Sequence, residues 1–147
     1  MARMKRFINK NAYRICAVAE KLTAGVVLTG AEVKAIRTRG IELKDAIVRI
    51  KDGEAFLVNA VINPYPFARI EDQQPSRERK LLLKESEIKR LINAKKAKLT
   101  IVATACYTKG RWIKIELGIG RIKNKRQRKQ DLIEREAERR LRQGLTQ

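Results

Sequence analysis

The chain contains no histidine, and this absence excludes several kinds of active site. A Ser-His-Asp triad, an imidazole general base and a histidine-ligated metal site all require that side chain. The two cysteines, Cys16 and Cys106, are too few for a disulfide scaffold or a four-thiolate zinc site. The acids are few and scattered, whereas a nuclease needs a cluster of metal-binding carboxylates. We therefore expect a protein that is not an enzyme and that uses no cofactor and no metal.

Long apolar segments are also missing. No run approaches the roughly 18 residues of a membrane span, and the N-terminal segment MARMKRFINKNAYR lacks the apolar core of a signal peptide. We therefore expect a soluble, cytoplasmic protein that does not enter a membrane. In that compartment Cys16 and Cys106 are expected to be two separate reduced thiols in the core, with a disulfide as the alternative if their strands adjoin.

Positive charge is what the chain has in excess. It carries 35 lysines and arginines against 16 acids, a formal net charge of +19 over 147 residues. Such a charge says nothing about the fold but favours a polyanionic partner. Six cations and no acid fall between residues 121 and 130, a run that cannot bury a face. We therefore expect a folded body over residues 1–120 and a basic tail over residues 121–147 that is disordered when free.

The body has the patterns of a small antiparallel barrel. Runs rich in β-forming residues predict six strands, at about residues 12–20, 24–29, 45–51, 54–62, 99–107 and 113–119. Asp52-Gly53 and Lys109-Gly110 predict the turns of two hairpins. Local hairpins without a repeated βαβ unit favour a six-stranded antiparallel OB-type barrel, in an all-β dominated α+β fold with two or three short helices.

Two of the predicted helices interrupt these strands. Thr29 and Glu32 match a capping box for a helix that ends at Gly40. Apolar residues at helical spacing predict a second helix over about residues 84–93. The segment between the hairpins, residues 63–80, contains three prolines and is predicted to be a long polar loop.

Four stretches of the sequence resemble one family, the SsrA-binding proteins (small protein B) of bacterial trans-translation. They are Asn9-Lys10, AGVVLTGAEVKAIRTRG (24–40), DAIVRIKDGEAFLVN (45–59) and PSRERKLLL (75–83), and ELG (116–118) and ERE (134–136) follow in the expected order. The resemblance covers essentially the whole chain. It implies an OB-type barrel with flanking helices and an unstructured basic tail, in agreement with the patterns above.

The resemblance also implies an RNA-binding role without catalysis. Members of the family bind the elbow of the tRNA-like domain of tmRNA and stand in for its missing anticodon arm. Their tail enters the vacant mRNA channel of a stalled ribosome, beside the small-subunit ribosomal RNA of the decoding centre, and folds into a helix there. The nascent peptide is then tagged for degradation. The expected partners of this chain, a monomer, are therefore tmRNA, the stalled ribosome and, indirectly, the elongation factor that carries aminoacyl-tmRNA.

Matching the motifs residue by residue gives a candidate RNA-binding set on the body. Its members offer cations for phosphates, an amide or hydroxyl for hydrogen bonds, or an apolar side chain for a base: Asn9, Lys10, Thr23, Lys34, Arg37, Arg77, Arg79, Lys80 and Leu82. Thr23 stands where the family usually has a glutamate. Structural alternatives stay open for several of them: a core leucine for Leu82, a solvated helix face for Lys34 and Arg37, and a strand cap for Asn9.

The tail supplies the candidate ribosome-binding residues, which are Arg121, Lys123, Lys125, Arg126, Arg128, Lys129, Ile133 and Arg135. They keep the cationic character of the family's tail but not its glycine-lysine-lysine and aspartate-lysine-arginine motifs. Arg126 stands where an aromatic residue or histidine commonly stacks on ribosomal RNA, and its planar guanidinium can stack instead. Residues 131–142 predict a helix that is marginal alone and forms fully on docking. A charged helix packed on its own body is the alternative.

A second function stays open from the residues themselves. A basic OB-type barrel also suits a ribosomal protein or an RNA chaperone. Competition between tmRNA, bulk tRNA and ribosomal RNA distinguishes these functions, because only a tmRNA-binding factor prefers tmRNA.

Overall fold

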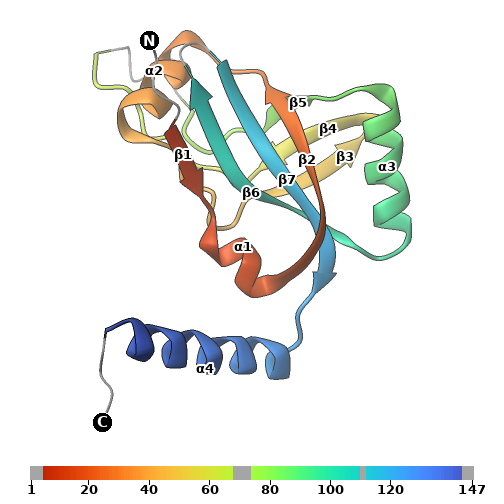
Figure 1. Cartoon of the computed structure of the whole chain (residues 1–147). Helices are drawn as coiled ribbons and strands as arrows, with labels where there is room; N and C mark the ends of the chain where they lie inside the picture. The colour runs from red at the N-terminus through yellow and green to blue at the C-terminus, as the bar shows by residue number, and fades with distance from the viewer. Residues whose placement is uncertain (1–4, 68–73, 110–111, 144–147) are drawn as a thin grey trace.

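The strands of the protein form a closed ring in the computed structural model, which describes residues 5–67, 74–109 and 112–143. Seven antiparallel strands in these ranges make one sheet in the order β1-β6-β3-β4-β5-β2-β7. β7 also pairs with β6, so six of the strands close on themselves and β1 lies outside the ring, beside β6 (Figure 1).

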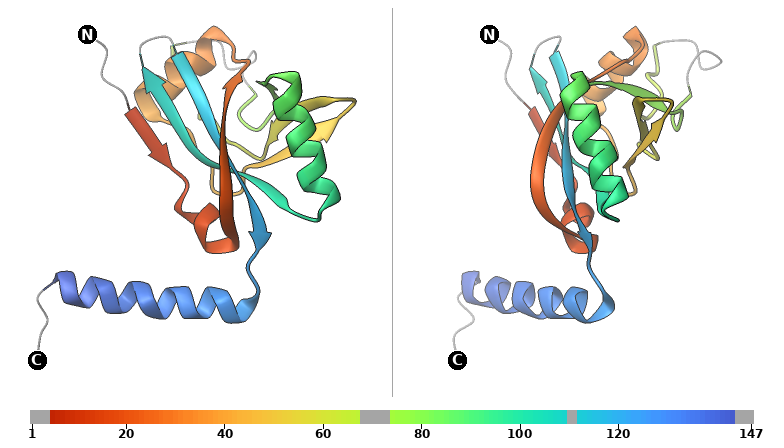
Figure 2. Two further views of the ribbon diagram at one scale, coloured as in Figure 1. Left: turned by 45° about the vertical axis from the view of Figure 1, so that its right-hand side comes forward. Right: turned by 90° about the vertical axis from the view of Figure 1, so that its right-hand side faces the viewer.

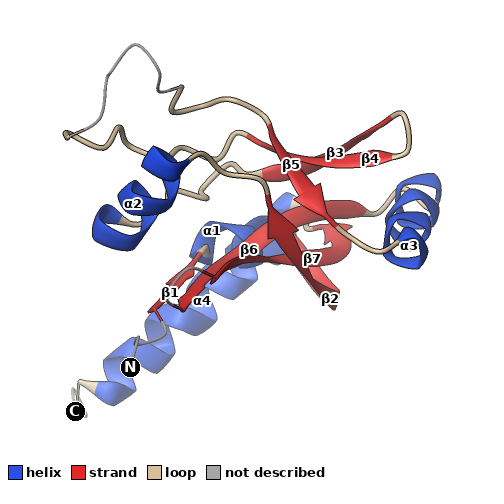
Figure 3. Ribbon diagram, turned by 90° about the horizontal axis from the view of Figure 1, so that it is seen from above, coloured by secondary structure: helices blue, strands red, loops and turns tan. Residues whose placement is uncertain are grey.

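Helices separate the first strands along the chain, whereas β3–β5 and β6–β7 follow one another without an intervening helix. Their order is β1 (Lys5–Ile8), α1 (Lys10–Ile15), β2 (Cys16–Val26), α2 (Gly30–Arg39), β3 (Ile47–Lys51), β4 (Glu54–Val58), β5 (Arg79–Leu82), α3 (Glu85–Lys96), β6 (Thr100–Lys109), β7 (Trp112–Ile122) and α4 (Lys125–Arg142). α2 and α3 lie at opposite ends of the ring (Figure 3). The fold is therefore a sheet-rich α+β arrangement with four helices in the described residues.

The predicted number of six strands is wrong, because the described residues contain seven. The predicted strands at 12–20 and 24–29 are one strand, β2, with an irregularity in its pairing between Val18 and Glu20. Two further strands, β1 and β5, were not predicted. β1 has four residues, and β5 begins with two cations, so neither shows the apolar alternation that identifies a strand.

Helix α1 occupies the start of the first predicted strand. Asn9 accepts a hydrogen bond from the backbone N–H of Ala12 and caps this helix. Ala12 is buried together with Cys16 and Val102, so α1 covers one end of the sheet. This packing outweighs the β-propensity of residues 12–15, which is a weak local preference.

The turn and capping signals correspond to the structure. Asp52 and Gly53 both have positive φ, 52° and 75°, as the tight hairpin between β3 and β4 requires. Thr29 and Glu32 form the capping box of α2, which ends at Gly40 with φ of 83°. Strands β6 and β7 pair up to Lys109 and Trp112, as expected for a hairpin, although the predicted turn residue Gly110 lies outside the described residues.

The hydrophobic core fills the ring. Val48, Leu57, Leu81, Ile115 and Leu117, from four different strands, are each at most 2% exposed. Burying such side chains is the main favourable contribution to folding. The two cysteines are buried and free, without a disulfide. Burial raises the pKa of Cys106 to about 12, so this side chain stays a thiol.

The last strand of the sheet continues past Gly120. β7 continues to Ile122, which pairs with Cys16 of β2. A Cβ on Gly120 would lie 1.9 Å from the carbonyl oxygen of Ala17, so close strand packing explains this glycine. α4 begins at Lys125 and extends away from the ring (Figure 2). Among the described helices, none combines the length and apolar character needed to cross a membrane.

Candidate nucleic-acid interface

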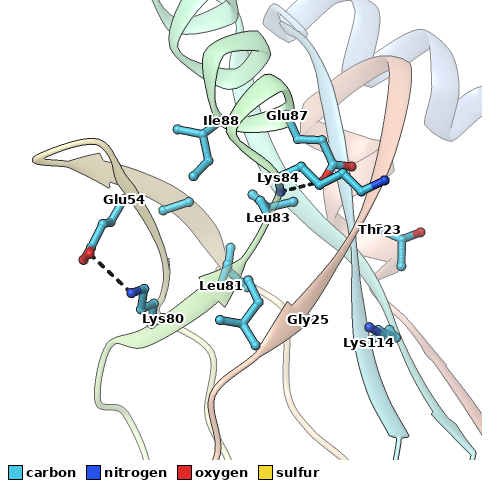
Figure 4. A pocket seen from close by; sticks show the side chains of 12 residues that line it. Thr23, Gly25, Glu54, Lys80, Leu81, Leu83, Lys84, Glu87, Ile88 and Lys114 are labelled. Carbon is cyan, nitrogen blue, oxygen red and sulfur yellow. Dashed lines mark hydrogen bonds and ion pairs between the residues drawn. The ribbon is translucent and has the colours of Figure 1, made fainter.

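A shallow pocket opens beside β2, β5, β7 and the start of α3, and it gathers three of the predicted RNA-binding residues. Its volume is about 620 Å³, and Thr23, Lys80 and Leu82 line it. Lys84 and Lys114, which the motifs did not identify, also line it. Figure 4 shows Thr23 and Lys114 on one side of the pocket and Lys80 on the other. We call this the Leu82 pocket.

Leu82 lies on the outside of the ring. The side chains of β5 alternate, so Leu81 is 2% exposed whereas Leu82 is 54% exposed. Leu82 pairs with Gly25 on β2, and a Cβ on Gly25 would lie 3.2 Å from the Cβ of Leu82. Because Gly25 has no side chain, the surface of β2 beside Leu82 stays open. The structure thus rules out a core leucine at this position and presents an apolar side chain among lysines, a combination that suits a base or ribose.

Lys80 projects from the same face of β5. Its ammonium lies 3.3 Å from the carboxylate of Glu54, and both side chains are about half exposed. An ion pair this exposed contributes little to the free energy of folding. The ammonium of Lys80 can therefore leave Glu54 and bind a phosphate with little loss of stability. Lys84 and Lys114 add two further exposed cations around the pocket.

Arg79, the next predicted residue along the chain, is fully buried. Its Nε donates to the carboxylate of Glu32 at 2.8 Å. Its other nitrogens donate to the carbonyl oxygens of Ala60, Gln74, Pro75 and Arg77, at 2.9–3.2 Å. Every N–H of the guanidinium thus has a partner inside the protein. Arg79 therefore ties β5 to α2 and to residues 74–77, and offers no free donor to RNA.

Arg77 joins the same buried cluster. Its guanidinium forms an ion pair with Glu32, and its side chain is 27% exposed. Burial alone would raise the pKa of Glu32, but hydrogen bonds from Arg77, from the Thr29 backbone and from Arg79 outweigh it, and the pKa is lowered. Glu32 therefore stays ionised and holds two arginines besides capping α2.

Asn9 is likewise inside the protein, 5% exposed. Its side-chain NH₂ donates to the carbonyl oxygens of Leu43 and Ala103, and its oxygen accepts from Ala12. The amide is therefore fully used in joining α1, β6 and the segment before β3. Asn9 caps a helix, α1, and not the strand that the sequence had suggested at this point.

The other predicted cations of the body lie in two different places. Lys34 and Arg37 are exposed on α2, across the ring from α3 (Figure 3). The ammonium of Lys34 is 5.9 Å from the ring centre of Tyr65. Lys10 is exposed at the start of α1, where it lines a second pocket with Arg135 of α4. The structure thus brings Lys10 and Arg135 together, but separates Lys34 and Arg37 from the Leu82 pocket.

Lys123 fixes the start of the tail to α1. Its backbone N–H donates to Ile15 at 2.8 Å, and its ammonium donates to the carbonyl oxygen of Tyr13 at 3.0 Å and pairs with Asp131. Lys123, only 18% exposed in its side chain, is therefore a structural anchor. Arg121 is exposed at the end of β7.

The rest of the tail forms α4, which lies beside α1 and has mostly exposed side chains. Arg126, Lys129, Ile133 and Arg135 are exposed, as are Leu132 (52%) and Leu141 (71%). Lys125 and Arg128 belong to the same helix, but their side chains lie outside the described residues. The cations of α4 that face α1 line the second pocket together with Lys10, Tyr13 and Arg14: Arg135, Arg139 and Arg142.

Comparison with known families settles where this architecture belongs. The family model described as SmpB protein matches residues 7–147, which include the ring, both pockets and the tail. The chain belongs to the SmpB family. Two similar relatives are the SsrA-binding proteins of Desulfitobacterium hafniense (42% identical over 90% of this chain and 86% of the relative) and of Streptococcus agalactiae (39%, 89% and 85%).

A solved SmpB structure has the same arrangement. It comes from a study of tmRNA–SmpB and its journey to the centre of the bacterial ribosome. The two chains are 34% identical and superpose with a TM-score of 0.68, over 82% of this chain and 85% of the other. The fold seen here is therefore that of an SmpB protein.

The sequence contained a signal for Lys114 that the motifs did not use. Ile113, Ile115 and Leu117 face the core, so the alternation of β7 places Lys114 on the outside, opposite Tyr107. Nothing local indicates that Arg79 is buried, because its partner Glu32 is 47 residues away.

The charge on Glu32 makes the stability of this protein depend on pH. Because folding lowers the pKa of Glu32 below its ordinary value of 4.5, its contribution is complete above that pH and is lost as the pH falls through the folded pKa. We expect the free energy of unfolding, measured by urea denaturation between pH 7 and 3, to fall less steeply below pH 4.5 in Glu32→Gln than in the unmodified chain.

Glu85→Gln is the control for this measurement. The side chain of Glu85 is 87% exposed on α3, so its replacement should leave the pH profile nearly unchanged. Parallel acid profiles for Glu32→Gln and the unmodified chain would contradict a charged Glu32 in the folded state.

Proposed function

We propose that this chain binds the tRNA-like domain of tmRNA and delivers it to stalled ribosomes, where the nascent peptide is tagged and the ribosome is rescued. The observation that carries this proposal is the SmpB family match over residues 7–147, together with the likeness to an SmpB chain studied with tmRNA and the ribosome. The Leu82 pocket supports it, because an exposed leucine surrounded by lysines suits a folded RNA with accessible bases.

We assign RNA binding to the body and contact with the ribosome to the tail. The ring, which we assign to the OB type because six antiparallel strands close it, binds the tRNA-like domain through the Leu82 pocket, Lys10, Lys34 and Arg37. The position of α1 and β5 is fixed by hydrogen bonds and ion pairs of three residues that do not contact the RNA, Asn9, Arg77 and Arg79. The body thus presents a preformed surface to the RNA.

The tail probes the vacant mRNA channel and the ribosomal RNA of the decoding centre. Its helix, α4, contacts the body mainly through α1 and the linker at Lys123, and its apolar side chains Ile133 and Leu141 are exposed. A helix with so little tertiary support is marginal in water. We therefore assign it a disordered state when free and a helical state on the ribosome.

The remaining parts of the proposal follow from this role. The chain acts without catalysis or a cofactor, as a cytoplasmic monomer, and meets the elongation factor only through aminoacyl-tmRNA. A general RNA-binding protein is the second candidate. In a gel-shift competition, tmRNA should displace bound labelled tmRNA far more effectively than bulk tRNA or ribosomal RNA does. Equal competition by all three would contradict the proposal and favour the second candidate.

The exposed cations should determine the salt dependence of RNA binding. Because each phosphate contact releases counterions, Lys34→Ala, Arg37→Ala and Lys80→Ala should each reduce the slope of log K against log salt by about 0.7–0.9. Lys89→Ala is the control, since Lys89 is an exposed cation on α3 that pairs with Glu85 and lies outside the candidate set. An unchanged slope in all three variants would place the RNA elsewhere on the protein.

A further inference from the structure

The sheet formed by β1, β6, β7 and β2 has an outer face that is largely free of helices (Figure 1). The register places Arg6 opposite Tyr107, and Tyr107 opposite Lys114. Trp112 lies two residues before Lys114 on β7, so it projects from the same face. We call these four residues, Arg6, Tyr107, Trp112 and Lys114, the aromatic face.

Each aromatic ring of this face is accompanied by a cation. The guanidinium carbon of Arg6 lies 5.3 Å from the ring centre of Tyr107, and the ammonium of Lys114 lies 6.0 Å from that of Trp112. Trp112 is 70% exposed, which is unusual for a side chain of this size. Tyr107 and Trp112 are diagonal neighbours on paired strands, a placement that separates residues by about 7–8 Å.

The ring of Tyr107 is held by a buried acid. Its hydroxyl donates to the carboxylate of Glu116, which also accepts from Thr104 at 2.9 Å and pairs with Lys21 at 3.4 Å. Glu116 is 8% exposed, and its carboxylate is paired with Lys21 and hydrogen-bonded to Thr104 and Tyr107. Its negative charge therefore does not face a partner on the surface. The cluster therefore fixes the tyrosine ring and leaves the exposed part of the face aromatic and positive.

We propose that the aromatic face is a stacking platform for unpaired RNA bases, with Tyr107 and Trp112 stacking on bases and Arg6 and Lys114 contacting the adjoining phosphates. Aromatic side chains on the exposed face of a sheet, flanked by cations, bind single-stranded RNA segments in this way. The inference rests on the proposed function and extends it, because Lys114 belongs to both the aromatic face and the Leu82 pocket. A single RNA segment can therefore occupy both.

Trp112 provides a direct test, because it is the only tryptophan of the chain. The full-length protein is titrated with the tRNA-like domain of tmRNA and, separately, with a small-subunit ribosomal RNA fragment containing the decoding-centre loops. Tryptophan emission, its quenching by acrylamide and a gel shift are recorded together. Quenched emission and protection from acrylamide with either RNA support the platform, and the RNA that produces them identifies which one it binds.

Variants at Tyr107 separate stacking from support of the fold. Tyr107→Leu should weaken binding of the RNA that quenches Trp112 by about 5- to 150-fold, the range found for loss of one base–aromatic stack. Tyr107→Phe keeps the ring and loses only the hydroxyl, so its affinity should stay close to that of the unmodified chain. Trp112→Ala, at a mostly exposed position, should lose affinity without a change in melting temperature.

The outcomes also distinguish this inference from the proposed function. If the tRNA-like domain or the ribosomal RNA fragment binds in the gel shift while Trp112 emission and acrylamide accessibility stay unchanged with both, the platform is overturned and the RNA-binding function stands. Equal affinities of Tyr107→Leu and Tyr107→Phe would overturn it as well, leaving the face to a protein partner. Failure of both RNAs to bind would overturn the function together with the platform.

Discussion

Replacing Arg79 by alanine is expected to lower the free energy of unfolding by about 3–5 kcal/mol. The arginine has no exposed surface, and its removal leaves the buried carboxylate of Glu32 with one arginine instead of two. The carbonyl oxygens of Ala60, Gln74 and Pro75 lose their donors as well. Urea denaturation at pH 7 measures the loss, because the midpoint should fall while the slope stays the same.

The adjacent residue provides the matched control. Lys80 occupies the same strand, but its side chain is half exposed and pairs with Glu54 at the surface. Lys80→Ala should therefore change stability by no more than about 1 kcal/mol. A double-mutant cycle of Glu32→Gln and Arg79→Ala should show strong coupling, since the two groups are in direct contact. Equal losses in Arg79→Ala and Lys80→Ala would refute a structural role for the buried pair.

Removing residues 124–147 is expected to abolish tagging of nascent peptides on stalled ribosomes, while affinity for the tRNA-like domain stays within about threefold. The body retains the Leu82 pocket, Lys34 and Arg37, whereas the whole of α4 is lost. The truncation begins at 124 because Ile122 still pairs with Cys16, and the backbone N–H of Lys123 still bonds to Ile15. Gel shifts measure the first property, and peptide tagging in a reconstituted translation system measures the second.

A milder variant tests whether tagging requires the apolar side chains of α4 to bind the ribosome, or only the presence of the helix. Ile133→Ala combined with Leu141→Ala preserves length and charge, does not lower the helix propensity, and removes two exposed apolar side chains. Tagging should fall at least about fivefold, with affinity for the tRNA-like domain unchanged. Full tagging by the truncated chain, or a large loss of RNA affinity on truncation, would contradict the division of work between body and tail.

Local chemistry was sufficient to predict several elements. Asp52-Gly53 requires positive φ and formed a hairpin, and the Thr29–Glu32 capping box formed at the start of α2. Such signals depend on residues at most a few positions apart, so they can be recognised without knowing the fold. The helix predicted over 84–93 is α3, which extends to Lys96.

The elements that could not be predicted depend on contacts between residues that are far apart in the sequence. β5 carries the buried Arg79, which is stable there only because Glu32 lies beside it in the folded chain. α1 formed in place of a strand because Asn9 bonds to Leu43 and Ala103 as well as to Ala12. The alternation that exposes Leu82 and buries Leu81 was likewise ambiguous until the pairing with β2 was known.

The amino-acid sequence alone excludes histidine-dependent chemistry and establishes both the strong positive charge and the resemblance to the SsrA-binding proteins, because composition and motifs can be recognised without knowing the fold. Which cations face outward became known only from the folded chain. Two of the predicted RNA ligands, Asn9 and Arg79, are buried and form hydrogen bonds between elements of the fold. Lys114, in contrast, was not predicted and is exposed. The reason is physical: whether a polar group is solvated or buried depends on the partners that folding brings to it.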